Sequence, residues 1–132
     1  MEFQNPNSNK DIIITLKRWL ENRNHKKTFA DYFRECGYET IAIVDAGEIG
    51  RILYDELKES EINVKWFADE NAEGIREIEG IPVCLMKDMI NMSDVDIICI
   101  SPIFDYAAIT RYLVNKNCKI ATLCLKDAVY EF

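Results

Sequence analysis

The sequence is poor in the residues on which several classes of function depend. It holds one histidine, His25, which excludes mechanisms that use paired histidines. Its five cysteines form no CxxC pair, and because zinc sites and dithiol centres need clustered ligands, no metal site is expected. Five glycines and three prolines in 132 residues are too few for a disordered or fibrous chain. A packed globular protein with reduced cysteines is therefore expected.

Long apolar runs and concentrated positive charge are also missing. The longest apolar stretches, such as residues 12–14 and 97–100, are much shorter than a membrane span. The first ten residues, MEFQNPNSNK, lack the basic-then-apolar pattern of a signal peptide. The formal net charge is -7, and no segment gathers enough Lys and Arg to follow a phosphate backbone. We therefore expect a cytoplasmic protein that binds neither nucleic acid nor membrane.

The length favours one domain. A chain of 132 residues can bury a core but is too short for a cofactor domain and a catalytic domain together, which argues against a complete dehydrogenase. Residues 1–9 are polar and aperiodic and predict a disordered tail. Residues 10–37 predict an N-terminal cap of two helices, the second between Thr28 as N-cap and Gly37 as C-cap. Residues 38–132 predict a Rossmann-like nucleotide-binding domain that forms one unit with the cap.

Strand and helix patterns alternate after Gly37, which is typical of a parallel sheet with crossover helices. Pro82 predicts that the third strand lies at an edge, and the segment NAEGIREIEG before it is too short for a full crossover helix. We predict an α/β fold, a doubly wound parallel sheet with the strand order 3-2-1-4-5. The expected strands are residues 40–45, 62–68, 81–85, 95–101 and 119–123, and the expected helices are residues 49–59, 87–92 and 103–115.

Residues 42–51, AIVDAGEIGR, nearly reproduce the GxGxxG turn that holds a pyrophosphate. An apolar strand precedes the turn, a helix follows it, and Asp69 lies 19 residues after Gly50 at the end of the second strand. In such a turn Gly47 lets the backbone approach a diphosphate and Gly50 lets the helix pack on the strand, while Asp69 accepts hydrogen bonds from a ribose. This context predicts a Rossmann-type fold, the fold that binds dinucleotides such as NAD or NADP.

Asp45 stands where the pattern requires its first glycine. Asp tolerates a positive φ better than most residues, so the bend survives. A carboxylate about 4 Å from a phosphate nevertheless costs on the order of 4 kcal/mol at an effective dielectric of about 20, whereas a helix N-terminus returns only about 0.3 to 2 kcal/mol. Either Asp45 caps the amides of Gly47 and Glu48 and fills the anion site itself, or Arg51 neutralises it. The sequence leaves both arrangements open.

The other wall of the crevice should be the segment SPIFD, because ligands of such sheets bind where the strand order reverses. Ser101 is a candidate donor to a ribose or sugar hydroxyl. Pro102 ends the strand, and Ile103 and Phe104 are candidates to line a base. Each of these residues has an alternative reading as an ordinary residue of a turn or a helix start.

The pattern YxxxK, the tyrosine and lysine pair of short-chain dehydrogenases, occurs twice, at Tyr54 with Lys58 and at Tyr112 with Lys116. So short a pattern arises readily by chance. Neither pair follows the strand on which that chemistry would need it, so both are interpreted as surface pairs.

Four segments resemble, in their order, the NAD(P)-binding Rossmann domains of bacterial polysaccharide-biosynthesis proteins, the nucleotide-sugar epimerase and dehydratase relatives: IAIVDAGEIGRILYDEL, WFADENA, EGIPV and VDIICISPIFDYAAI. The resemblance spans about residues 38–130 and rests on the order of the motifs more than on any one of them. It implies that NAD(P) or a nucleotide sugar binds at Asp69 and at the residues of the turn, which are Ala46, Gly47, Glu48, Ile49 and Gly50.

Three functions remain open on the sequence. The first is a nucleotide-binding module, non-catalytic or dependent on a partner, that binds NAD(P) or a nucleotide sugar at residues 45–50, 69 and 101–103 and is connected with surface-sugar synthesis. The second is an interaction domain that keeps the fold without the ligand and forms a homodimer through its N-terminal helices. A stand-alone sugar-nucleotide oxidoreductase is less favoured because of the length. No catalytic residue is assigned.

Overall fold

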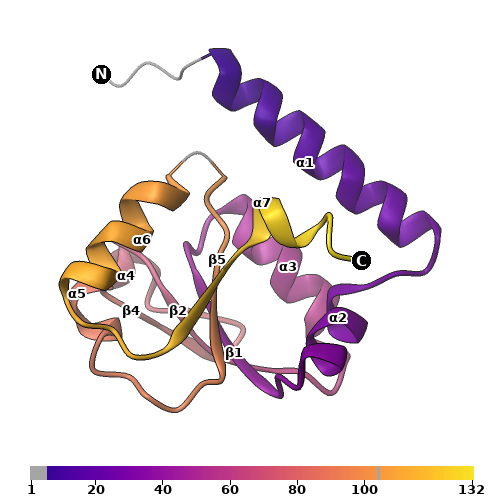
Figure 1. Ribbon diagram of the computed structural model, residues 1–132. Coiled ribbons are helices and arrows are strands. Elements are labelled where there is room, and N and C mark those ends of the chain that lie inside the picture. The colour runs from indigo at the N-terminus through magenta and orange to yellow at the C-terminus, as the bar shows by residue number, and fades with distance from the viewer. Residues whose placement is uncertain (1–5, 104) are drawn as a thin grey trace.

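The computed structural model describes residues 6–103 and 105–132 and arranges them as a sheet with helices on both faces (Figure 1). Within these residues no helix is both long enough and apolar enough to cross a membrane. One face of the sheet packs against α2 (Phe29–Cys36), α3 (Glu48–Leu57) and α7 (Leu125–Ala128), and α1 (Pro6–Asn24) lies outside these helices. The other face packs against α5 (Met86–Met89) and α6 (Tyr106–Asn115).

The sheet has six strands in the order β3-β4-β2-β1-β5-β6. Every neighbouring pair is parallel except β3 with β4, which is antiparallel. The chain is therefore a mixed α/β protein with a mostly parallel sheet. The strands are β1 (Thr40–Val44), β2 (Asn63–Ala68), β3 (Glu77–Ile78), β4 (Ile81–Cys84), β5 (Ile97–Ile100) and β6 (Ala121–Cys124).

The sequence predicts five strands, and the strand that this prediction omits is β3. After the single helical turn α4 (Ala72–Ile75), the chain forms a two-residue strand that turns back through Gly80 and pairs with β4. Pro82 therefore does not lie in the edge strand, because β3 lies outside it. Pro82 is tolerated because β4 pairs with β2 only from Val83 onward, and the bond to the Arg76 carbonyl, at 2.9 Å, comes from the Val83 amide.

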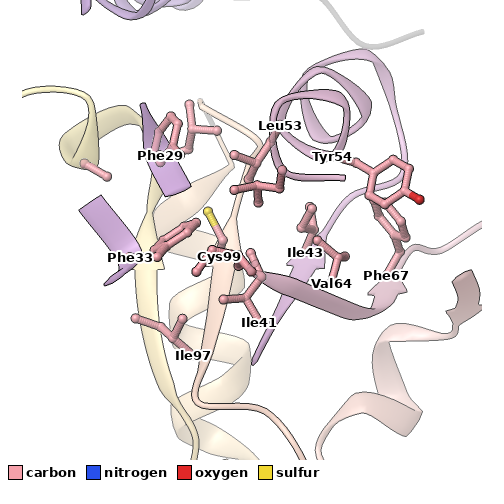
Figure 2. Packing of buried hydrophobic residues seen from close by; sticks show 14 of the residues in the cluster. Phe29, Phe33, Ile41, Ile43, Leu53, Tyr54, Val64, Phe67, Ile97 and Cys99 are labelled. Carbon is pink, nitrogen blue, oxygen red and sulfur yellow. The ribbon is translucent and has the colours of Figure 1, made fainter. Parts of the chain in front are cut away.

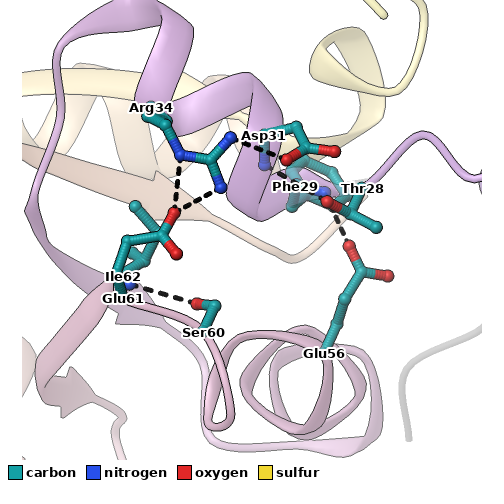
Figure 3. Close-up of polar contacts among 8 residues, drawn as sticks. All are labelled: Thr28, Phe29, Asp31, Arg34, Glu56, Ser60, Glu61 and Ile62. Atoms are coloured by element: carbon teal, nitrogen blue, oxygen red, sulfur yellow. Dashed lines mark hydrogen bonds and ion pairs between the residues drawn. The ribbon is translucent and has the colours of Figure 1, made fainter.

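The first helix also differs from expectation. It begins at Pro6, so residues 6–9 belong to a helix and not to a tail, while residues 1–5 lie outside the described residues. Proline suits the first turn of a helix because its missing N–H has no partner there. The second helix has the predicted caps: Thr28 Oγ1 accepts from the Asp31 amide at 3.2 Å, and Gly37 ends the helix with a φ of 84°. Figure 3 shows the Thr28 cap.

The core lies on both faces of the sheet because alternate residues of each strand point to opposite sides. Ile41 and Ile43 of β1 pack with Phe29, Phe33 and Leu53 under α2 and α3 (Figure 2). Their neighbours on β1, Ala42 and Val44, pack on the opposite face against residues of β2, β5 and α6. Burial on both faces explains why β1 and β5 read as continuous apolar runs.

A buried carboxylate joins the cap to the sheet domain. The Glu56 side chain on α3 is only 3% exposed and accepts hydrogen bonds from Trp19 Nε1 of α1 at 2.9 Å and from the Phe29 amide of α2 at 2.7 Å. It also forms an ion pair with Arg23 at 3.1 Å. The Phe29 bond appears in Figure 3. Both cap helices are thus attached through one side chain.

Candidate functional site: a cleft at the carboxyl ends of the strands

A cleft of about 770 Å³ lies where several strands end. It is lined by the last residues of β1 and β2, Val44 and Ala68, and by Leu85 and Pro102, which follow β4 and β5. Residues of α5 and α6 form its outer walls. Ligands of open α/β sheets bind outside the carboxyl ends of the strands, so this cleft is the place where a small molecule is expected.

Asp45 occupies the turn that leads from β1 into α3. Its φ of 83° lies in the left-handed region that glycine would occupy in the expected motif. Its Oδ1 accepts a hydrogen bond from the Gly47 amide at 2.9 Å, and Gly47 is the N-cap of α3. The side chain thus takes one of the amides that a helix N-terminus leaves without a partner. Of the two arrangements that the sequence left open, the structure has the first, made through Gly47.

Arg51 is held at the same turn by the backbone. Its Nε donates to the Ala46 carbonyl at 2.9 Å. Among the ion pairs of the described residues none joins Arg51 to Asp45. The guanidinium therefore stays close to the turn, where its charge helps to lower the pKa of Asp69, but it does not form the predicted neutralising pair with Asp45.

Asp69, at the end of β2, also contacts the turn. Its Oδ2 accepts from the Ala46 amide at 2.8 Å and its Oδ1 from the Asn71 amide at 2.8 Å. Burial is the largest single effect and acts to raise the pKa of Asp69, but the bonds from Asn71 and Ala46, the contact with Asp45 and the charge of Arg51 together hold the pKa below its usual value. Asp69 is therefore an ionised carboxylate that connects the end of β2 to the glycine turn.

The pKa of Asp45 is shifted in the opposite direction to that of Asp69. Burial raises its pKa to about 6, and a hydrogen bond with the Asp69 carboxyl adds to the rise. The hydrogen bond from the Gly47 amide acts to lower the pKa, whereas the negative charges of Asp69 and Asp105 raise it further. Two neighbouring carboxyls whose pKa values are pushed apart share a proton more readily than they accept a further negative group.

Gly50 is required by packing. A Cβ at this position would overlap the carbonyl oxygen of Asp45 and would lie 3.3 Å from Ile43 Cγ2. A Cβ at Gly47 would lie 3.1 Å from Asp45 Oδ1, a contact that a small shift of the side chain relieves. Gly50, at the third glycine position of the motif, therefore sets the close approach of α3 to β1, as the motif predicts.

Acidic and apolar side chains line the cleft. Asp45, Asp69, Glu70 and Asp105 all line it, against a single cation, Lys87. The other lining side chains are apolar or aromatic. Although four carboxyls line one cleft, no group of three or more metal-ligating side chains is placed to hold a metal ion within residues 6–103 and 105–132.

Comparisons with protein-family models, with curated proteins and with solved structures find no match for this chain. The site is therefore interpreted from its own geometry.

Of the other residues that the sequence predicts for the site, some line the cleft and others do not. Pro102 lines the cleft with Asp45 and Asp69. Ser101 is buried and its hydroxyl donates to the Val44 carbonyl at 2.6 Å, which links β5 to β1. Ile103 is buried. Ile49 packs against the core, Glu48 is exposed in the first turn of α3, and Phe104 lies outside the described residues.

The sequence does not predict the walls that α5 and α6 supply, in particular Met86, Lys87 and Tyr112. The rule that places ligands at the carboxyl ends of strands pointed to this region but not to individual helix residues. Tyr112 was interpreted as a surface residue, yet it is half-buried and lines the cleft, with Lys116 Nζ 6.0 Å from its ring centroid. Tyr54 is buried. The surface interpretation is therefore wrong for the Tyr54 ring, whereas Tyr112 is partly exposed in the cleft and both lysines are exposed.

Proposed function

We propose that this chain is a nucleotide-binding module of Rossmann type, non-catalytic by itself or dependent on a partner, and that its ligand binds in the cleft at the carboxyl ends of the strands. The order β4-β2-β1-β5-β6 of the parallel strands supports the fold assignment, since it corresponds to 3-2-1-4-5 when the hairpin strand β3 is set aside. NAD(P) and nucleotide sugars are the ligand classes that the resemblance suggests. A role in surface-sugar synthesis and a cytoplasmic location are likewise proposals, and they rest on the sequence alone.

One observation carries the proposal. The cleft lies along the carboxyl ends of β1, β2, β4 and β5. It therefore includes the point between β1 and β5 where the chain, having added β2 and β4 on one side of β1, crosses to the other side. Asp69 stands there at the end of β2. A carboxylate at this place is the group that accepts hydrogen bonds from a ribose in such folds. The apolar walls would accommodate a base.

Two neighbouring alanines on α6 provide a matched test. Ala107 and Ala108 are both exposed, but only Ala108 is among the residues that line the cleft. Binding to the purified chain should be measured by calorimetry and thermal shift with NAD, NADP, UDP-glucose, adenosine and uridine. We expect at least one to bind, Ala108→Trp to abolish that binding by filling the cleft, and Ala107→Trp to leave it unchanged. A ligand at about 100 times its Kd would stabilise the fold by about 2.7 kcal/mol.

Failure of every compound to bind would contradict the proposal. Equal binding to the Ala108→Trp variant would place the ligand elsewhere and would contradict the assignment of the cleft.

A second candidate function, an interaction domain, is favoured by a separate observation. Ile13 and Leu20 of α1 are 66% and 61% exposed, and they lie seven residues apart, on one face of the helix. Ile14 beside them is also exposed. Large apolar side chains on one helix face are typical of a contact surface. We propose, as the alternative, a homodimer formed through this face of α1.

Sedimentation of the wild-type chain and of Leu20→Glu tests this alternative. A dimer should dissociate when a carboxylate replaces Leu20, whereas the control Lys27→Glu, an exposed change in the turn after α1, should not alter the mass. A wild-type chain that is monomeric at about 100 μM would contradict the alternative.

A further inference from the structure

We infer that the ligand of the cleft carries no phosphate at the glycine turn: it is a nucleoside or another neutral, hydroxyl-bearing molecule whose hydroxyls face Asp45 and Asp69. This inference rests on the proposed function and narrows it. A dinucleotide bound in the usual way would place its diphosphate at this turn.

The backbone donors for a phosphate are already engaged. A phosphate at a glycine-rich turn is held by the amides around the N-terminus of the following helix. In this chain the Gly47 amide donates to Asp45 Oδ1 and the Ala46 amide donates to Asp69 Oδ2. Two of the chain's own carboxylate oxygens thus take amides that would otherwise hold phosphate oxygens.

The charge of the cleft acts in the same direction. A phosphate at the turn would meet Asp45 and Asp69 directly, and two further carboxylates, Glu70 and Asp105, line the same cleft. Among the described residues that line it, Lys87 is the only cation. Arg51 is close to the turn, but its Nε is used by the Ala46 carbonyl. Repulsion between like charges is not offset by these two cations.

Hydroxyl groups suit the same carboxylates. An ionised carboxylate has about four acceptor positions. Asp69 uses two of them for the amides of Ala46 and Asn71, Asp45 uses one for Gly47, and the contact between the two carboxyls takes a further position on each. The remaining positions accept donors, which a ribose or sugar diol supplies and a phosphate at neutral pH does not. The apolar wall formed by Leu85, Met86, Ile109 and Tyr112 would take the ring of the base.

Pairs of compounds that differ by one phosphate test this directly. Adenosine with AMP, and uridine with UMP, should be titrated at pH 7.5 into the wild-type chain, Asp45→Asn and Asp45→Gly. Asn has the same shape, tolerates the positive φ and keeps an acceptor for the Gly47 amide, so it removes only the charge. Gly also frees the amide.

We expect the wild-type chain to bind at least one nucleoside at least about tenfold more tightly than its monophosphate, a difference of about 1.4 kcal/mol. The preference should decrease in Asp45→Asn and decrease further in Asp45→Gly, because the monophosphate binds more tightly to each variant, while the nucleoside, which loses an acceptor at Asp45, binds no more tightly than to the wild-type chain. If Asp45→Gly does not fold, Asp45→Asn alone decides.

Two other results would overturn the inference. A monophosphate that binds the wild-type chain as tightly as its nucleoside, or a preference that neither substitution changes, would show that Asp45 does not exclude phosphate, and the proposed function would stand. If no compound of either pair binds to any of the three chains, the inference fails, and the proposed function fails with it only where NAD, NADP and UDP-glucose do not bind either.

Discussion

The Asp45 side chain accepts the Gly47 amide at 2.9 Å, two residues further along the same turn. Asp45 thereby performs two tasks. Its backbone adopts the left-handed conformation that the turn requires, at a φ of 83°, and its carboxylate gives the first turn of α3 a hydrogen-bond partner. The turn therefore keeps the backbone shape of the glycine motif. Its Gly47 amide, however, is bonded to Asp45 and not available to another acceptor.

Gly50→Ala should destabilise the fold. In a helix interior this change normally stabilises by about 1 kcal/mol, but here the added Cβ would overlap the Asp45 carbonyl oxygen. We expect a net loss of about 1 to 3 kcal/mol in the free energy of unfolding, measured by urea denaturation. Gly47→Ala is the matched control, since its Cβ would meet only a side-chain oxygen at 3.1 Å, and its loss should be smaller. Equal losses would contradict this account of the packing.

The stability should depend on the protonation of Asp45. Its pKa rises from 3.8 to about 6 on folding, so the folded chain binds the proton more tightly. The resulting stabilisation is fully present below about pH 4 and is lost as the pH rises through about 6. Asp69, whose pKa is lowered, acts in the opposite sense: its contribution is present above about pH 4 and is lost as the pH falls through its lowered pKa.

Comparison of the wild-type chain with Asp45→Asn isolates the first effect. Between pH 4.5 and 7.5 the stability of the wild-type chain should fall relative to the Asn variant by on the order of 1 kcal/mol, because solvent partly screens the half-buried carboxyl. Urea midpoints at several pH values measure this difference. A constant difference across the range would show that Asp45 does not titrate there.

Glu56→Gln should weaken the attachment of the N-terminal helices. In the variant an NH2 group would replace one carboxylate oxygen and would face a donor, either Trp19 Nε1 or the Phe29 amide. Residue 56 would also lose the negative charge that pairs with Arg23. We expect a loss of about 2 to 4 kcal/mol in the free energy of unfolding. The exposed Glu59 supplies the control, since Glu59→Gln should change the stability by less than about 0.5 kcal/mol. Similar stabilities for the two variants would refute the role of Glu56.

Features with a local cause could be predicted from the sequence. Thr28 and Gly37 cap a helix through their own backbone neighbours, and the apolar run of β1 reflects burial on two faces. The pairing of a glycine turn with Asp69 followed from their spacing, and the structure brings the two together through the Ala46 amide.

Other features depend on contacts between distant segments and could not be predicted. The two-residue strand β3 exists because it pairs with β4, and its sequence is too short for any periodicity. Ser101 carries the same hydroxyl whether it faces a ligand or a neighbouring strand, and only the packing of β5 on β1 directs it to Val44. The acidity of the cleft likewise arises from residues of separate elements, such as Asp69 and Asp105.

The most direct test of the central claim is a carboxyl titration of Asp45 by nuclear magnetic resonance, followed together with the Gly47 amide. The structure predicts that Asp45 titrates near pH 6 and that the Gly47 amide shift follows the same curve, since the two groups share a hydrogen bond. The amide curve should be absent in Asp45→Asn. An Asp45 that titrates near its ordinary value of 3.8, with a Gly47 amide that does not respond, would contradict the claim that this side chain closes the turn.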